Sequence, residues 1–151
     1  MTIVRGLTAL RELAGTTLGP TEWHEVTQEQ VNTFADATGD HQWIHVDPAR
    51  AATGPFGGTI AHGYLTLSLI IPLWSDLVDL RDITTRVNYG LNKVRFPTPV
   101  PVGGKVRLSA HVAAVDQLTE DSVQATVDFT VELAGSAKPA VVAQALYRYY
   151  A

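Results

Sequence analysis

Cysteine is absent from this chain of 151 residues, and its absence removes several kinds of chemistry at once. Disulfides, thiolate nucleophiles and zinc sites built on cysteine are all excluded. Charged residues are also sparse, at 17% of the chain, and the formal net charge is -4. This balance disfavours binding to nucleic acid, whose phosphates attract basic surfaces. A chain of this length is expected to form one domain, residues 1–151.

Long apolar runs are missing too. No apolar stretch reaches the roughly 18 residues that a membrane span needs, because Asp76 and Asp79 interrupt the best candidate. The first residues, MTIVRGLTALRELAG, are too polar for a signal peptide and include Glu12. We therefore expect a cytoplasmic protein that does not insert into a membrane.

Acidic residues are missing from one further stretch, between Asp82 and Asp116. The basic residues in that stretch are Arg86, Lys93, Arg95, Lys105 and Arg107. A locally basic face on an acidic protein suits a phosphorylated small ligand better than a polyanion. Chance explains the gap equally well, so charge alone does not identify a ligand.

Local signals predict two helices around a short connection. Thr27 and Gln30 form a capping-box pattern, and Gly39 is placed to end that helix in a left-handed conformation. Asp47, followed by a proline, is typical of the start of the next helix. Residues 40–46 are therefore a tight connection that is held at both ends, which suits it to fix side chains.

The rest of the chain predicts an α+β fold. A short helix is expected within residues 3–14 and a short strand at residues 21–26. From Gly63 to Asp79 the sequence is apolar nearly all round, which is typical of a buried helix, and Pro72 should kink it. Strand-like alternation then follows at residues 85–96, 105–116, 122–133 and 140–150. A buried helix followed by long antiparallel strands suggests a sheet wrapped around that helix.

The held connection carries Asp40 and His45. A carboxylate and an imidazole on one loop can hydrogen-bond a single water, remove a proton from it and return one elsewhere. The simpler explanation of the spacing is that Asp40 caps a turn and His45 packs in a loop.

Gly63 stands where the buried helix begins, so its backbone N–H is an unpaired donor of the first turn. Glycine lets a ligand approach closely, and a helix N-terminus directed at a carbonyl can serve as an oxyanion hole. Close packing of the helix against a strand would explain a glycine at this position equally well.

Other chemistries fit less well. The candidate metal ligands are His41, His45, Asp47 and His62. No HExxH-like signature supports them, and we expect neither a metal nor another cofactor. Ser68 lies inside a helix and lacks a G-x-S-x-G elbow, which disfavours a serine triad. The segment GPFGG is not followed by Lys-Ser/Thr, so it is no phosphate-binding loop.

Two stretches, DHQWIHVDPARAA and FGGTIAHGYLTLSL, resemble the signature of the MaoC-like dehydratases, also called (R)-specific enoyl-CoA hydratases or hydratase 2. The later segment NKVRFPTPVPVGGKVRL is similar to the family's pattern after its helix, so the resemblance covers about Thr27 to Leu108. It implies a hot-dog fold, a long central helix wrapped by a curved antiparallel sheet, and a homodimer.

The resemblance also implies an activity without metal or redox cofactor, which leaves His41 and His62 as supporting or structural residues of the site. The reaction is reversible hydration of a trans-2-enoyl thioester, carried by coenzyme A or acyl carrier protein, to the (R)-3-hydroxyacyl thioester. Asp40 and His45 match the family's catalytic pair. Gly63 matches the glycine whose N–H forms the oxyanion hole, and Ser68 matches a polar residue of the site.

Further roles follow from the same resemblance. Leu65 and Leu69 are expected to line the acyl pocket. Many members have Asn-Pro where this chain has Gln42 and Trp43, so Trp43 is expected to reshape that pocket. The candidate partners for coenzyme A phosphates are Lys93, Arg95 and Lys105.

Two rival functions use the same fold. A hot-dog thioesterase would typically place its acid on the central helix, and this helix has no Asp or Glu before Asp76. A non-catalytic acyl-thioester-binding protein would keep the pocket without the pair, and the presence of both Asp40 and His45 argues against it.

Overall fold

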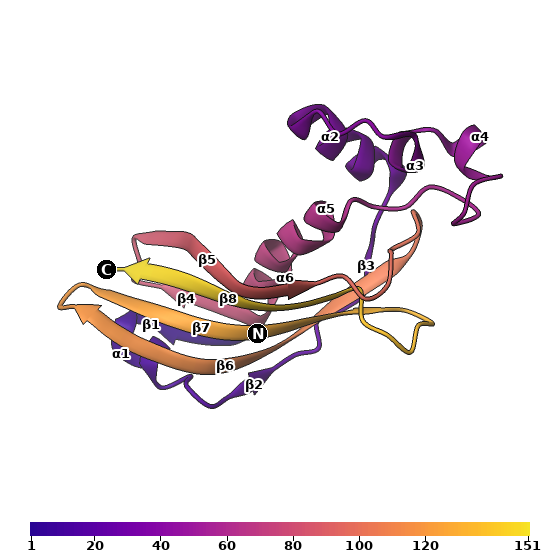
Figure 1. Ribbon diagram of the computed structural model, residues 1–151. Coiled ribbons are helices and arrows are strands. Elements are labelled where there is room, and N and C mark those ends of the chain that lie inside the picture. The colour runs from indigo at the N-terminus through magenta and orange to yellow at the C-terminus, as the bar shows by residue number, and fades with distance from the viewer.

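A curved antiparallel sheet forms most of the computed structural model, which describes residues 1–151 (Figure 1). Its strand order is β2-β6-β7-β8-β5, and β3 also pairs with β6. The strands are β2 (Thr17–Leu18), β3 (His24–Glu25), β5 (Thr85–Arg95), β6 (Lys105–Thr119), β7 (Ser122–Leu133) and β8 (Val141–Tyr150). The four long strands predicted from alternation are all present.

Six helices accompany the sheet: α1 (Gly6–Arg11), α2 (Gln28–Thr38), α3 (Trp43–Val46), α4 (Pro48–Ala51), α5 (Gly63–Ser68) and α6 (Ile70–Leu77). The central helix is α5 and α6 together, interrupted at Leu69. The interruption lies one turn before Pro72, which has no N–H to donate to the carbonyl of Ser68. None of these helices has the length and apolarity needed to cross a membrane.

The core fills the space between the central helix and the sheet. Buried positions alternate with less buried ones along β7 and β8, so each strand presents one apolar face inward. The Trp74 ring meets Phe129 edge-on, and its Nε1–H donates to the Tyr149 hydroxyl at 3.3 Å. This arrangement confirms the expected α+β hot-dog fold. The helix is not buried all round, however, because Tyr64 and Ile71 are exposed.

The N-terminus departs from the expectation of a single helix at residues 3–14. Strand β1 (Thr2–Arg5) pairs in parallel with β4 (Val78–Arg81), and α1 begins only at Gly6. The buried Val4 lies opposite Leu80 in this pair. The apolar spacing that suggested one helix therefore belongs to two elements. The expected strand at residues 21–26 is also shorter, because only His24–Glu25 pairs with β6.

Candidate active site

The connection between α2 and α4 is held at both ends, as predicted. The Thr27 hydroxyl accepts a hydrogen bond from the Gln30 N–H at 3.2 Å, and Gly39 ends α2 with a φ of 80°. The Asp47 carboxylate caps α4 at 3.0 Å. Between these caps, the single turn of α3 carries His45 on its inner side.

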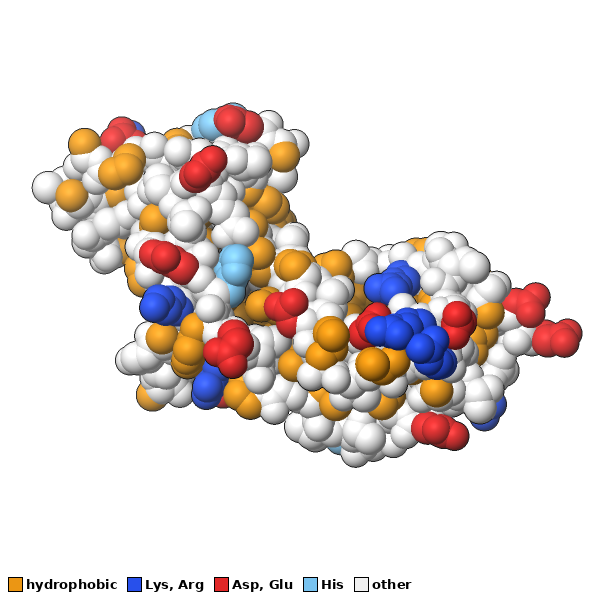
Figure 2. Space-filling view, turned by 180° about the vertical axis from the view of Figure 1, so that it is seen from behind, with side chains coloured by type: hydrophobic (Ala, Val, Ile, Leu, Met, Phe, Trp, Pro, Cys, Tyr) orange, Lys and Arg blue, Asp and Glu red, His pale blue; other side chains and the backbone are white.

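A cavity lies where the lobe of α2, α3 and α4 joins α5, and Figure 2 shows the molecule hollowed between this lobe and the rest. Its volume is about 540 Å³, which falls in the range of small-molecule sites. It is lined by Phe34, Thr38, Asp40, His45, His62, Gly63, Tyr64 and Phe96. The structure thus brings Asp40, His45 and Gly63 to one cavity.

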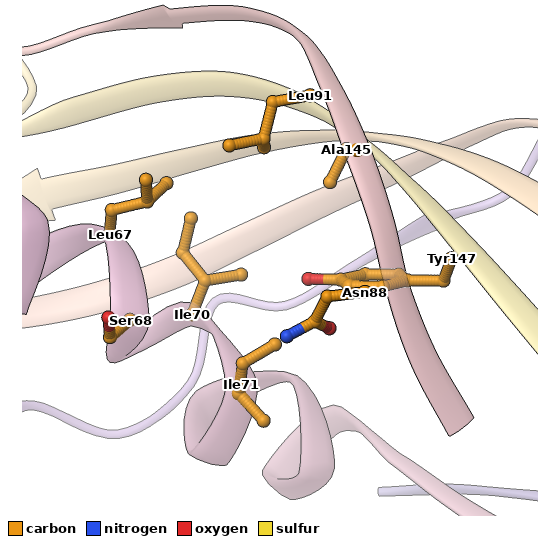
Figure 3. A pocket seen from close by; sticks show the side chains of 9 residues that line it. Leu67, Ser68, Ile70, Ile71, Asn88, Leu91, Ala145 and Tyr147 are labelled. Atoms are coloured by element: carbon orange, nitrogen blue, oxygen red, sulfur yellow. The ribbon is translucent and has the colours of Figure 1, made fainter. Parts of the chain in front are cut away.

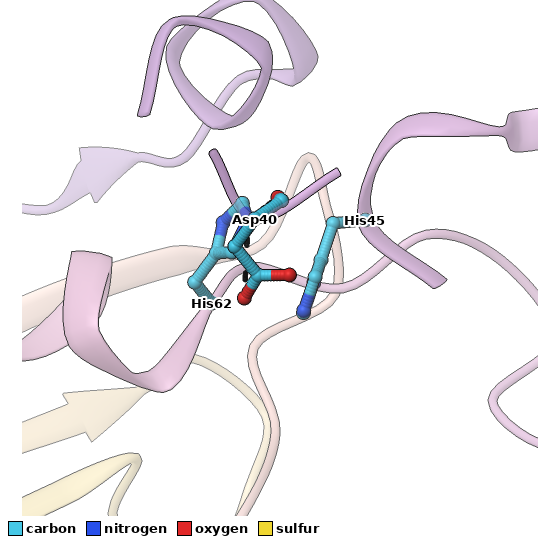
Figure 4. A group of neighbouring side chains, drawn as sticks. All are labelled: Asp40, His45 and His62. Carbon is cyan, nitrogen blue, oxygen red and sulfur yellow. Dashed lines mark hydrogen bonds and ion pairs between the residues drawn. The ribbon is translucent and has the colours of Figure 1, made fainter. Parts of the chain in front are cut away.

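Three side chains form a cluster at this cavity. One polar atom from each of Asp40, His45 and His62 lies within 4.8 Å of the others (Figure 4). A hydrogen bond spans about 2.8 Å, so one water can bridge two atoms up to roughly 5.6 Å apart. The Asp40 side chain is 54% exposed, whereas His45 is 7% exposed. The cluster therefore joins a solvated carboxylate to a buried imidazole.

The hydrogen bond of His45 defines its tautomer. Its Nδ1 lies 2.7 Å from the backbone carbonyl oxygen of Ile60. Because a carbonyl oxygen only accepts, Nδ1 carries the proton in the neutral ring and Nε2 carries the lone pair. His45 can therefore accept a proton through Nε2.

His62 contacts both of the other members of the cluster. Its Nε2 lies 2.9 Å from the backbone carbonyl oxygen of Asp40. Its ring stacks on the His45 ring, with centroids 3.9 Å apart and an angle of 25° between the planes. The sequence suggests His62 first as a metal ligand and, given the family resemblance, as a supporting or structural residue. No local signal could reveal the stack, because α5 and α3 come together only in the folded chain.

The candidate metal set from the sequence is not assembled as a whole. His41 bonds to Asp36 at 2.8 Å and Asp47 caps α4, so neither reaches the cluster that includes His62. The pKa of the exposed His41 is raised, chiefly by its hydrogen bond with Asp36.

In the cluster of Asp40, His45 and His62, the stacked rings of the two histidines hold their nitrogen lone pairs in nearly parallel planes. Metal ligands instead point at one centre, so the cluster suits a bound water better than a metal ion.

Gly63 is the first residue of α5, and its N–H has no acceptor inside the helix. A Cβ at this position would lie 3.3 Å from the Phe96 ring. Close packing against Phe96 is therefore one reason for a glycine at this position. Gly63 also forms part of the cavity wall beside Asp40 and His45.

Ser68 lies in a different place from the pair. Its hydroxyl donates to the Tyr64 carbonyl at 2.7 Å. Its side chain lies at a second cavity, of about 380 Å³, between the central helix and strands β5 and β8 (Figure 3). The lining residues are Leu67, Ser68, Ile70, Ile71, Asn88, Gly90, Leu91, Ala145 and Tyr147. We call this space the helix–strand cavity.

The three residues expected to shape the acyl pocket lie outside both cavities. Trp43 packs toward α4, with its ring 4.4 Å below the Arg50 guanidinium and so close to Gly54 that a Cβ there would be 2.9 Å away. Leu65 and Leu69 are buried in the core. Their apolar character therefore reflects packing of the central helix.

The three candidate phosphate-binding residues do not cluster within one chain. Lys93 and Arg95 are exposed on β5, at one edge of the main sheet. Lys105 is exposed on β6, beyond β8 and β7. Three strand spacings separate β5 from β6, which amounts to roughly 14 Å. Arg95 directly precedes Phe96, which lines the cavity at Asp40.

Comparison with known proteins gives concordant matches. Residues 10–133 match the family model described as MaoC like domain. The chain is 56% identical to 3-hydroxyacyl-thioester dehydratase Z of Mycobacterium tuberculosis over 94% of both chains. It is 44% identical to Nodulation protein N of Rhizobium leguminosarum bv. viciae, over 85% of this chain and 81% of that protein. The solved (R)-hydratase from A. caviae involved in PHA biosynthesis is 27% identical, with a TM-score of 0.67 and coverage of 89% and 94% of the two chains.

Proposed function

We propose, from the premise that this chain belongs to the MaoC-like dehydratase family, that it catalyses reversible hydration of trans-2-enoyl thioesters to (R)-3-hydroxyacyl thioesters. The observation that carries the proposal is that polar atoms of the solvated Asp40 carboxylate and of His45 lie within 4.8 Å of each other, a separation that one water can bridge. The relatives named as a 3-hydroxyacyl-thioester dehydratase and an (R)-hydratase support the reaction class.

The reaction can be followed through the groups of the cavity. His45 Nε2 accepts a proton from the water while Asp40 holds the other hydrogen of the same molecule. The water oxygen bonds to C3 as the C2–C3 π bond breaks, and negative charge moves onto the thioester oxygen. The Gly63 N–H stabilises that oxygen. The proton taken from the water then returns to C2, so that one water is added and the pair is restored.

The acyl chain is assigned to the helix–strand cavity of Figure 3. Most of its lining is apolar, with Leu67, Ile70 and Leu91 among the side chains. It lies one helical turn along α5 from Gly63 and Tyr64, which line the cavity of the reacting atoms. Ser68 then contacts the acyl chain at the start of its path, and Trp43 has no part in binding it.

Coenzyme A is the proposed carrier, with its phosphates beside Lys93 and Arg95. Both side chains are exposed on β5 and carry no acidic partner. The strand leads directly into Phe96 at the cavity. Lys105 is left out of a site made by one chain, because it lies at a different part of the sheet.

A homodimer and a cytoplasmic location complete the proposal. Strand β5 is an edge of the main sheet, and Val87, Tyr89 and Leu91 on it are exposed. Ile71 adds an exposed apolar side chain from the central helix. An open strand edge beside apolar side chains favours pairing with another chain.

The deciding experiment incubates the purified protein with crotonyl-CoA and follows the absorbance of the enoyl thioester. We expect that absorbance to fall and the product to be the (R)-3-hydroxy thioester. Release of free thiol, read with a thiol reagent, would instead identify a thioesterase. Binding of the ester without either change would identify a non-catalytic acyl-thioester-binding protein.

A further inference from the structure

His62 takes no part in the reaction described above, yet its contacts connect the residues that do. It is 3% exposed, and it immediately precedes Gly63 at the start of α5. Its Nε2 meets the backbone of Asp40 at 2.9 Å, and its ring covers the His45 ring at 3.9 Å. One side chain therefore touches both halves of the proposed catalytic pair.

We propose that His62 is a positioning residue, which holds Asp40 and His45 at their working separation through one hydrogen bond and one ring stack. This inference rests on the proposed function, since it assumes that Asp40 and His45 act together on one water.

The hydrogen bond matters because Asp40 has few other anchors. Its N–H donates to the Thr38 hydroxyl and its carboxylate accepts from the Gln42 N–H, both at 3.4 Å and both from neighbours in the chain. The contact with His62 is shorter and joins Asp40 to a distant segment. Without it, the residue after Gly39 is free to move away from α5.

The stack matters because His45 is held at only one edge of its ring. Its Nδ1–H donates to Ile60, which leaves rotation about that bond to be limited by neighbours. His62 limits it on one face. Phe34 of α2 in turn packs against His62 in a tilted contact, with ring centroids 4.9 Å apart, so His62 is itself supported by the helix that leads to Asp40.

An idle nitrogen supports the same assignment. Because the backbone carbonyl oxygen of Asp40 can only accept a hydrogen bond, His62 Nε2 carries the proton in the neutral ring and Nδ1 carries the lone pair. That Nδ1 is buried and has no hydrogen-bond partner. An unsatisfied buried acceptor is costly, and a native protein holds few of them. The idle Nδ1 comes with an imidazole whose ring and Nε2–H both make contacts here, whereas Phe offers only the ring and Gln only the donor.

Two variants separate the contacts. His62→Gln keeps an N–H donor near the position of Nε2 and loses the ring, whereas His62→Phe keeps the ring and loses the donor. We expect each to lower kcat for crotonyl-CoA by about 10-fold to 100-fold, the usual effect of misplacing reacting groups by about 1 Å. KM should change by less than about three-fold, since His62 does not bind the substrate. The control is His41→Gln, on the loop that carries Asp40, which should leave both constants unchanged.

Nuclear magnetic resonance of the wild-type imidazoles tests the geometry without any substitution. Two-bond ¹⁵N–¹H spectra should show His62 as the Nε2–H tautomer and His45 as the Nδ1–H tautomer. The His45 ring protons should shift in His62→Gln, where the stack is lost, more than in His62→Phe.

The inference is overturned if folded His62 variants keep kcat within about two-fold of the wild type, or if wild-type His62 carries its proton on Nδ1. Should both variants fail to fold, the wild-type spectra decide. Failure of the proposed function itself looks different, because the wild-type protein would then hydrate no enoyl thioester while the tautomers could still be as expected.

Discussion

At the scale of single residues, Asp40 and His45 differ in burial, and this difference fits the different roles proposed for them. The Asp40 side chain is half exposed and meets water directly, while His45 is buried with Nδ1 committed to Ile60. An exposed carboxylate holds and orients a water, and a buried imidazole with one free lone pair removes its proton.

Asp40→Asn and His45→Gln should each lower kcat for crotonyl-CoA hydration by about 10²-fold to 10⁴-fold. The Asn side chain keeps the size of Asp40 but loses its charge, and Gln loses the imidazole lone pair. Steady-state kinetics measures the effect, and circular dichroism checks that each variant is folded. Asp36→Asn, on the adjoining helix, is the matched control. Near-normal turnover in either variant of the pair would refute the assignment.

His41 should titrate above 6.5, because the Asp36 carboxylate favours its charged form. A group whose pKa is raised on folding stabilises the fold below its unfolded pKa, and this contribution is lost as the pH rises through the folded pKa. The effect on stability should be small, since His41 is exposed. Proton resonances of the ring, followed against pH, give the pKa. In Asp36→Asn the pKa should fall back toward 6.5, and no change would contradict the cause given.

At the scale of elements, the helix caps and the antiparallel long strands were predicted correctly, whereas the pairing of β1 with β4 was missed. The caps at Thr27, Gly39 and Asp47 depend on residues within one helical turn, so the sequence alone revealed them. The parallel pair of β1 and β4 joins residues far apart in the chain. Both strands have only four residues, and a parallel pair is not joined by a hairpin turn, so no local pattern indicated the pairing.

Gly39→Ala should destabilise the protein by about 1–2 kcal/mol, because a side chain at a φ of 80° strains the backbone. An added Cβ would meet no atom within 4 Å, so the cost comes from conformation alone. Urea denaturation measures the difference. Gly58→Ala is the control, since that glycine also has open space but no positive φ. Equal effects of the two substitutions would contradict the cap.

Strand β5 carries the proposed phosphate contacts. Replacing Lys93 and Arg95 by alanine should raise KM for a coenzyme A ester about 10-fold and leave KM for the matching pantetheine ester nearly unchanged. Only the first substrate has the nucleotide phosphates. Lys105→Ala should leave both values unchanged, because β6 lies across the sheet. Equal changes for the two esters would remove the phosphate role.

At the scale of the whole molecule, the fold class could be predicted because the order of elements is visible in the sequence. A long apolar helix precedes alternating strands, and the sheet wraps that helix as expected. The cavities could not be predicted. Phe34, Tyr64 and Phe96 reach the site from three distant segments. Trp43 lies between Asp40 and His45 in the sequence, yet its side chain packs against Arg50 and does not line the site.

Tyr89→Glu should convert the proposed homodimer to a monomer, because it places a charge on the open edge of β5. Tyr89 is 53% exposed in the single chain. Light scattering coupled to size exclusion measures the mass. Leu118→Glu is the matched control, at 43% exposure on the far end of β6. A dimer that survives Tyr89→Glu unchanged would place the contact elsewhere.

Helix α5 connects the two cavities in a way that bears on selectivity. In the proposed mechanism its first residue offers the N–H for the thioester oxygen. Its N-cap, His62, contacts Asp40 and His45, and its second half lines the helix–strand cavity. An acyl chain that fits poorly beside Leu67 therefore displaces the same short helix that arranges the reacting groups. In this proposal the length of the acyl chain changes kcat more than KM, so a poorly fitting substrate binds but is converted slowly.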